Sequence, residues 1–173
     1  MQYFGEERFF ERDELIVSKT DIKGRITYAN NAFLRIADYT EVEVIGKPHN
    51  VIRHPSMPHG IFELLWRTIS AGEELFAYVV NKAKNNDHYW VIAHVTPSIQ
   101  AGKIVGFHST RRVPNPDTIK NVIEPLYDRL NTIEAASSNR KDGTTASFNS
   151  LMTMLNEKQI SYAEFIADLT RKD

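Results

Sequence analysis

The chain has 173 residues, of which 42% are hydrophobic and 25% are charged, and this fits one globular domain with some additional helix. Its 21 basic and 22 acidic residues give a net charge of −1, so the charge balance favours neither nucleic acid nor an anionic membrane as a partner. The absence of cysteine excludes disulfides, zinc–thiolate sites, iron–sulfur clusters and any bond between a thiol and a cofactor.

The sequence carries no signal for membrane insertion or export. No apolar run approaches the roughly 20 residues that a spanning helix needs. Residues 1–8 contain early acidic side chains where a signal peptide would have an apolar centre. We therefore expect a soluble, cytoplasmic chain.

The first half of the chain predicts a hairpin followed by short helices. Residues 6–13 predict a short helical cap that presents Phe9 and Phe10. Turn-forming residues at 21–24 join two predicted strands into a hairpin, at residues 15–20 and 25–29. Helices with apolar positions three and four apart are predicted at residues 32–37, 40–45, part of 48–54 and 61–71.

From Leu75 onward the hydrophobic period becomes two. Three strands are predicted, at residues 75–81, 87–97 and 103–113. In the middle strand the alternation puts one set of side chains on one face, namely His88, Trp90, Ile92, His94 and Thr96, and another on the opposite face, namely Tyr89, Val91, Ala93 and Val95. Two strands, a helical middle and three strands predict an α+β fold, with a five-stranded antiparallel sheet and short helices on one face.

A proline-containing linker at 113–117 leads into predicted C-terminal helices. The apolar positions of the first are spaced by three and four residues and are Ile119, Val122, Leu126, Leu130 and Ile133. Pro125 is expected to kink this helix or to begin a second one. Polar residues 137–145 predict a mobile loop, and Ser161 with Glu164 predicts a capping box for a last helix.

Several separate stretches carry a family resemblance. They are Ser18-Lys-Thr-Asp21, Ile26-Thr-Tyr-Ala-Asn30, the segment 46–58 and the segment 81–91. In order and spacing they resemble the PAS sensor domain of bacterial aerotaxis receptors, which hold FAD non-covalently. The resemblance implies three parts: an N-terminal cap at 1–13, a PAS domain at 14–113 and a helical extension at 114–173. Asn86 stands where the family has glycine, and asparagine tolerates the positive φ of that turn.

The resemblance also implies a cofactor site. The positions that match residues implicated in FAD binding or redox signalling are Asn30, Arg53, His54, Phe62 and Asn81. Arg53 is suited to a forked contact with the pyrophosphate. Trp66 and Trp90 add aromatic surface for the ring or the adenine.

Most of these residues also have a purely structural interpretation. Arg53 can cap a helix or pair with Glu63, and His54 can bond a buried carbonyl. The other structural roles are a helix cap for Asn30, hairpin architecture for Asn81 and Asn85, and core packing for Trp90. The remaining histidines interpreted as structural or exposed are His49, His59, His88 and His108.

We expect a free-standing cytoplasmic module that binds FAD and signals redox or oxygen state, of the kind used in aerotaxis and chemotaxis. Its partner would be a signalling protein such as a chemoreceptor, kinase or cyclase. No enzyme motif and no metal-spaced histidine set is present. One alternative is a b-type haem sensor with His54, His88 or His94 as the axial ligand. Another is a cofactor-free interaction module.

Exposed apolar surface is expected at both ends of the chain. At the N-terminus it comes from Phe4, Phe9 and Phe10, and near the C-terminus from the apolar seam at 119–133. Surface of this kind normally finds a partner, and two-fold pairing is the commonest way to cover it. We therefore expect a homodimer through the N-terminal cap, or C-terminal helices that fold back on the chain.

Overall fold

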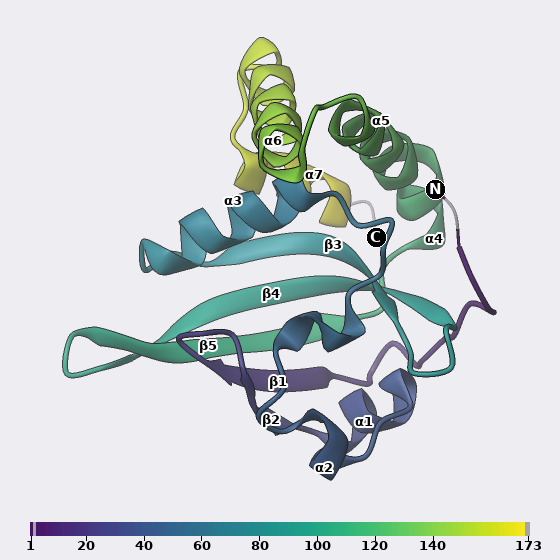
Figure 1. The fold of residues 1–173 in the computed structure, drawn as a ribbon, viewed down its shortest axis with the longest axis vertical. Coiled ribbons are helices and arrows are strands. Elements are labelled where there is room, and N and C mark those ends of the chain that lie inside the picture. The colour runs from purple at the N-terminus through teal and green to yellow at the C-terminus, as the bar shows by residue number, and fades with distance from the viewer. Residues whose placement is uncertain (2, 172–173) are drawn as a thin grey trace. The chain divides into compact units, whose positions relative to one another are not determined.

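The computed structural model describes residues 1 and 3–171 and contains a five-stranded antiparallel sheet with helices (Figure 1). The strands lie in the order β2-β1-β5-β4-β3. Their bounds are Ile16–Asp21 (β1), Ile26–Ala29 (β2), Leu75–Lys82 (β3), His88–Gln100 (β4) and Lys103–Arg112 (β5). The predicted α+β architecture with five antiparallel strands is confirmed.

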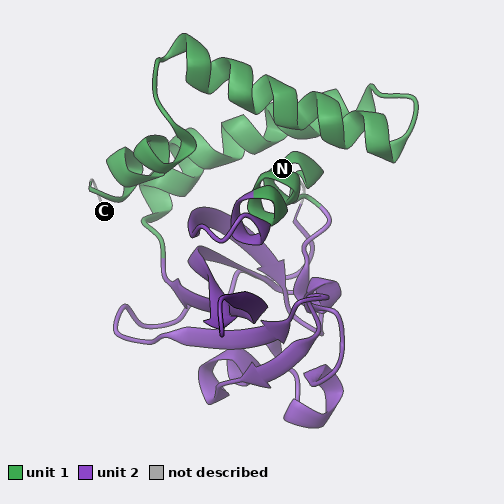
Figure 2. Ribbon diagram, turned by 90° about the vertical axis from the view of Figure 1, so that its left-hand side faces the viewer, with its two compact units in different colours: residues 1, 56–67, 114–173 green, residues 2–55, 68–113 purple. Residues whose placement is uncertain are grey.

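The chain divides into two compact units (Figure 2). One unit consists of residues 1, 56–67 and 114–173, and the other of residues 2–55 and 68–113. All five strands belong to the second unit. Helix α3 (His59–Ser70) begins in the first unit and ends in the second. Residues 56–67 thus group with the C-terminal helices.

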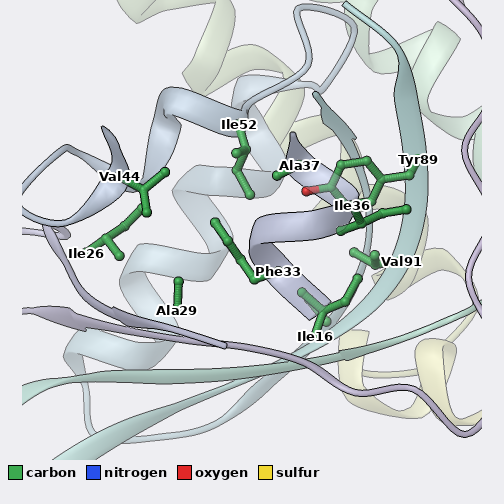
Figure 3. Packing of buried hydrophobic residues seen from close by; sticks show 11 residues of the cluster. Ile16, Ile26, Ala29, Phe33, Ile36, Ala37, Val44, Ile52, Tyr89 and Val91 are labelled. Carbon is green, nitrogen blue, oxygen red and sulfur yellow. The ribbon is translucent and has the colours of Figure 1, made fainter. Parts of the chain in front are cut away.

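Three short helical segments cover one face of the sheet in the second unit. They are α1 (Asn31–Ala37), α2 (Glu41–Val44) and the 3-10 helix η1 (His49–Ile52). Phe33 of α1 is fully buried among aliphatic side chains of these helices and of the strands (Figure 3). Tyr89 and Val91 of β4 belong to the same cluster. We call the sheet face that contacts this cluster the inner face and the opposite face the outer face.

The strand register assigns each side chain to a face. Val91 pairs with Val79, and Trp90 pairs with Val80, so alternate residues of β4 point to opposite faces. The predicted alternation of β4 is therefore confirmed. On the neighbouring β5, Gly106 lies so close to β1 that a Cβ atom there would come within 2.2 Å of the Thr20 carbonyl oxygen, and only glycine permits this approach.

The N-terminal segment corrects one prediction. Residues 6–13 do not form the predicted helix. Instead the Arg8 amide donates to the His88 carbonyl at 2.7 Å, and the His88 amide donates to the Glu6 carbonyl at 3.0 Å. The Arg8 guanidinium also pairs with Asp87 at 2.9 Å. The segment is extended because β4 continues past the end of β5, where its backbone groups have no partner on β5. The extended segment pairs with these groups, whereas a local helix would leave them unpaired.

In the first unit, four helices and one π-helical turn follow the linker. They are α4 (Pro116–Thr118), the π-helical η2 (Ile119–Ile123), α5 (Glu124–Ala135), α6 (Arg140–Glu157) and α7 (Tyr162–Thr170). Pro125 lies in the first turn of α5, as one of the two predicted outcomes required. Because Pro125 has no amide hydrogen to donate to the carbonyl of residue 121, the regular helix is interrupted just before Pro125. The predicted capping box of Ser161 and Glu164 is present.

The predicted loop at 137–145 is wrong over most of its length, because α6 already begins at Arg140. The Asn139 side chain caps this helix by accepting from the Asp142 amide at 3.0 Å. Gly143 allows the close approach of α5, since a Cβ atom there would lie 2.9 Å from the Glu134 carbonyl oxygen. Gly143 was interpreted from the sequence as part of a loop, but in the structure it lies inside α6 and allows that helix to pack closely on α5.

The central position of Phe33 gives a stability prediction. Phe33→Ala should lower the free energy of unfolding by about 3–5 kcal/mol, because it leaves a cavity in the cluster that joins the helices to the sheet. Phe9→Ala is the matched control, since Phe9 is 70% exposed and its loss should change stability by no more than about 0.5 kcal/mol. Urea denaturation followed by circular dichroism measures both. Equal losses in the two variants would contradict this description of the core.

Candidate functional site

Polar side chains interrupt the apolar inner face on three strands. Ser18 of β1 pairs with Ser109 of β5, and Arg111 pairs with Ala93 of β4. Asn81 pairs with the inner-face residue Tyr89. All of these polar residues are buried, and the exposed fraction of Arg111 is only 4%. The inner face therefore combines an apolar floor with a few buried polar groups, which is the usual composition of a small-molecule site.

Arg111 forms the largest of these polar groupings. Its Nη2 donates to Ser18 Oγ at 3.1 Å and to His49 Nε2 at 2.8 Å. Ser18 Oγ and His49 Nε2 lie 3.0 Å apart. The guanidinium also lies over the ring of Phe33, 5.8 Å from its centroid. We call Arg111, Ser18 and His49 the Arg111 cluster.

The Arg111 cluster carries a positive charge and no negative one. Burial lowers the pKa of Arg111 to about 10, so the group stays protonated at neutral pH. Burial, followed by the charges of Arg111 and Arg53, lowers the pKa of His49 to about 3, so that imidazole is neutral and can accept from Arg111. Among the described residues no carboxylate forms an ion pair with Arg111.

Four polar atoms of the inner face are buried without a hydrogen-bond partner in the described part of the chain. They are Asn81 Nδ2, Tyr89 Oη, Ser109 Oγ and Arg111 Nη1. Burial raises the pKa of Tyr89, so its hydroxyl keeps its proton. Since the great majority of buried polar groups in proteins are paired, four such atoms on one face indicate a place for a polar ligand.

Asn30 has the structural role that the sequence left open. Its Oδ1 accepts from the amides of Phe33 and Val17, both at 3.0 Å, and its Nδ2 donates to the Leu15 carbonyl at 2.8 Å. Asn30 therefore caps α1 and ties it to β1. Its acceptor oxygen is already used twice within the protein.

Arg53 lies beside Asn81. The two residues form an isolated antiparallel bridge, and the Arg53 amide ends η1 by donating to the Asn50 carbonyl at 3.0 Å. The charge of Arg53 also contributes to the low pKa of His49. Of the predicted site residues, Arg53 and Asn81 are thus brought together.

His54 and Trp90 belong to an aromatic cluster on the outer face. Tyr3 stacks on His88 with ring centroids 4.4 Å apart and lies edge-on to Trp90 at 6.5 Å. The His54 ring lies 5.6 Å from that of Tyr3, and burial, with the charges of His88 and Lys82, lowers the pKa of His54 to about 4. Because alternate residues of β4 face opposite ways, the predicted contact of Trp90 with the same ligand as Asn81 does not agree with the register.

The candidate haem ligands His88 and His94 share this outer face. His94 stacks on Phe76 with centroids 4.0 Å apart and pairs with Glu74 at 2.8 Å. Neither histidine points to the inner face, and His88 Nδ1 is itself buried without a hydrogen-bond partner in the described part of the chain.

Phe62 and Trp66 belong to the part of α3 that groups with the C-terminal helices. Trp66 is 38% exposed. The predicted role of both residues in cofactor binding stays a prediction.

Within that unit, Glu134 of α5 holds the start of α3. Its Oε1 accepts from the Gly60 amide at 3.0 Å and from Ser147 Oγ at 2.6 Å, while its Oε2 lies 2.7 Å from His59 Nδ1. Although burial raises the pKa of Glu134, the hydrogen bonds of Ser147, His59 and Gly60 outweigh it, so the pKa is lowered overall. The carboxylate acts as a helix cap supplied by another helix.

The Arg111 cluster was not predicted from the sequence. Ser18 was noted only as part of a family motif, His49 was interpreted as structural or exposed, and Arg111 was not singled out. One signal was present: Phe107, Ser109 and Arg111 alternate along β5, so a charged residue occupies an inward position.

Within residues 1 and 3–171, no group of three or more histidine, aspartate or glutamate side chains is arranged to hold a metal ion. Over the same residues, no helix has the length and apolar character needed to cross a membrane.

Comparison with known proteins agrees with this fold. Residues 26–111 match the family described as the PAS fold, so the chain carries a PAS domain. It is similar to the aerotaxis receptor of Escherichia coli strain K12, at 42% identity over 119 residues. This match covers 69% of the chain but 23% of the receptor, so the chain spans less than a quarter of that relative's length.

Solved structures show the same fold. The chain is similar to the light state of the LOV domain of the blue-light photoreceptor Aureochrome1, with a TM-score of 0.57 and 18% identity. The match covers 64% of this chain and 89% of that one. A LOV domain studied with a flavin analogue matches with a TM-score of 0.56 and 18% identity over 66% of this chain and 87% of that chain.

The low pKa of His49 predicts a pH dependence of stability. The unfolded chain protonates His49 near pH 6.5 and the folded protein only near 3, so the unfolded state binds more protons between these values. Stability should therefore fall as the pH falls below 6.5, by about 1.4 kcal/mol per pH unit from this residue. His49→Gln, which keeps an acceptor for Arg111, should remove that share of the slope between pH 6.5 and 5. Urea denaturation at several pH values measures it, and an unchanged slope would show that His49 titrates normally.

Proposed function

We propose that this chain is a PAS sensor module that binds FAD non-covalently on the inner face of its sheet and signals redox state to a partner protein. The observation that carries the proposal is the buried Asn81 Nδ2 without a partner, together with Ser109 Oγ and Arg111 Nη1 on the same face. An apolar face with convergent donors suits a planar ring with polar edges.

The residues fall into two groups in this proposal. Asn81 contacts one polar part of the ring, Ser109 and Arg111 contact another, and Arg53 binds the pyrophosphate. We assign Asn30 to helix capping, because its Oδ1 accepts from the Phe33 amide. We assign His54 and Trp90 to packing on the outer face, because both rings contact Tyr3 there.

Two further observations support a flavin. A relative at 42% identity is named an aerotaxis receptor, and one structural neighbour was studied with a flavin analogue. Bound FAD would supply reversible two-electron redox chemistry. Since the chain has no cysteine, the ring cannot form a bond to a protein thiol, and signalling would depend on redox state or occupancy.

A route for the signal follows from the chain order. The side-chain amide of Asn81 can donate to one redox state of a ring and accept from the other. Its backbone is bridged to Arg53, and six residues later His59 begins α3, whose first turn is bonded to Glu134. We propose that a change at Asn81 passes through this segment to α5. The partner would then be a signalling protein that contacts the C-terminal helices.

We also propose a homodimer. Phe4 is 52% exposed and Phe9 is 70% exposed, so the N-terminal segment offers apolar surface to a second copy.

Arg53→Ala should weaken FAD binding about ten- to a hundred-fold, because it removes a charge-assisted contact with the pyrophosphate worth roughly 1.5–3 kcal/mol. Arg12→Ala, which changes an exposed arginine with no hydrogen bond or ion pair to the described residues, is the matched control. Flavin fluorescence titration of the FAD-free proteins measures the affinities. Wild-type protein that binds no FAD would contradict the proposed function, and full affinity in Arg53→Ala would contradict only the role of Arg53.

Glu134→Gln tests the signalling route. In the wild type, reduction of bound FAD should change hydrogen exchange in β3 and also in the first turn of α3 and in α5. Glu134→Gln removes the charge that holds the α3 start, so the change should persist in β3 and be lost in α5. Glu157→Gln, at an exposed position, is the control. Identical exchange patterns in all three proteins would show that the signal leaves by another path.

A further inference from the structure

The Arg111 cluster contains a charge that the protein itself does not neutralise. The guanidinium is 4% exposed, and its described partners are a hydroxyl, a neutral imidazole and an aromatic ring. A buried charge without a counter-charge costs several kcal/mol, and proteins normally pair such groups with a carboxylate. A second cation, Arg53, is close enough to lower the pKa of His49. The region is therefore suited to a negative group from outside the chain.

The guanidinium also has donor capacity left for that group. Both contacts of Arg111 to Ser18 and His49 are made by Nη2, while Nη1 is buried without a described partner. Ser18 and His49 thus fix the orientation of the guanidinium and leave one of its nitrogens available. Such fixed donors act without reorganisation when charge develops near them.

We propose that the Arg111 cluster is the receptor for the negative charge that the flavin ring gains on reduction, and that Arg111 thereby raises the reduction potential of the cofactor. This inference rests on the proposed function. Two electrons and one proton convert the neutral oxidised ring into a reduced ring with one negative charge. A group that binds the anionic form more tightly than the neutral form shifts the equilibrium toward reduction by that difference in affinity.

The sheet register allows Arg111 and Asn81 to act on separate parts of one ligand. Arg111 pairs with Ala93, and Asn81 pairs with Tyr89 on the same strand. At about 3.3 Å per residue, the two positions lie about 13 Å apart along β4. An extended ligand is needed to reach both, and Asn81 then contributes to binding independently of the charge of Arg111.

The test compares three variants of the full chain with bound FAD. Arg111→Gln keeps hydrogen-bond donors but removes the charge, and Arg111→Lys keeps the charge. Arg112→Gln is the matched control, because Arg112 is exposed and points to the other face. Spectroscopic titration with dithionite and a reference dye gives the midpoint potential, and fluorescence titration gives the affinity for oxidised FAD.

Arg111→Gln should lose a ten- to a hundred-fold preference for reduced over oxidised FAD, which corresponds to a midpoint about 30–60 mV lower. Its affinity for oxidised FAD should change much less. Arg111→Lys should keep most of the wild-type potential, and Arg112→Gln should keep all of it. Without FAD, Arg111→Gln should unfold at the same temperature as wild type or higher, because the uncompensated charge is gone.

Three results would overturn the inference. The first is an unchanged potential in Arg111→Gln that still binds FAD, which leaves the proposed function intact. The second is Arg111→Gln that fails to fold without FAD, since Arg111 would then be a structural residue. The third is wild-type protein that binds no FAD, which would overturn the proposed function as well.

Discussion

The pairing of β5 with strands on both of its sides is the constraint on which the inner face depends. Hydrogen bonds to β1 and to β4 fix which residues of β5 point inward. A slip by one residue would turn Arg111 outward and bring the exposed Arg112 into the core. Gly106 holds the same register at the other end of the strand, where a side chain would collide with Thr20. The sheet thus forces a charged side chain into an apolar layer.

The buried position of Arg111 lowers the stability of the fold, although it suits the proposed binding site. An inward arginine without a carboxylate works against folding, whereas the fully buried Phe33 and its aliphatic neighbours work for it. Proteins commonly break such rules where they bind or react. Two other partly buried charged groups do have partners, since Arg8 pairs with Asp87 and Glu134 accepts three hydrogen bonds. The exception at Arg111 therefore points to a site.

Local sequence patterns predicted the elements whose structure is decided locally. The alternation in β4 and the capping box at Ser161 are of this kind, and Asn86 has the predicted positive φ of 73°. Predictions failed where distant residues decide. The segment 6–13 is extended because His88 lies beside it, and Gly143, whose residue type suits a loop, lies inside α6 where it packs closely on α5.

The residues of the candidate site also differ in whether local sequence patterns could predict them. Asn81 and Arg53 were found from a motif, and the structure bridges them. The Arg111 cluster joins β1, η1 and β5, whose residues are far apart in the sequence. The alternation along β5 was a signal, not used in the sequence analysis, that Arg111 faces inward, but no local pattern could show that His49 would meet it. Trp90 was predicted as a cofactor contact because of its residue type. The strand register places its side chain on the face opposite to that of Asn81.

The N-terminal segment has a consequence for solubility. Where β4 runs on beyond β5, it presents the free amide and carbonyl of His88, and an exposed strand edge of this kind readily pairs with another chain. Glu6 and Arg8 occupy those two groups, and Arg8 anchors the segment through Asp87. The N-terminal segment therefore covers this edge of β4 and prevents it from pairing with the edge of another molecule. If the same segment exchanged between two copies, it would join them by domain swapping without forming any new kind of contact.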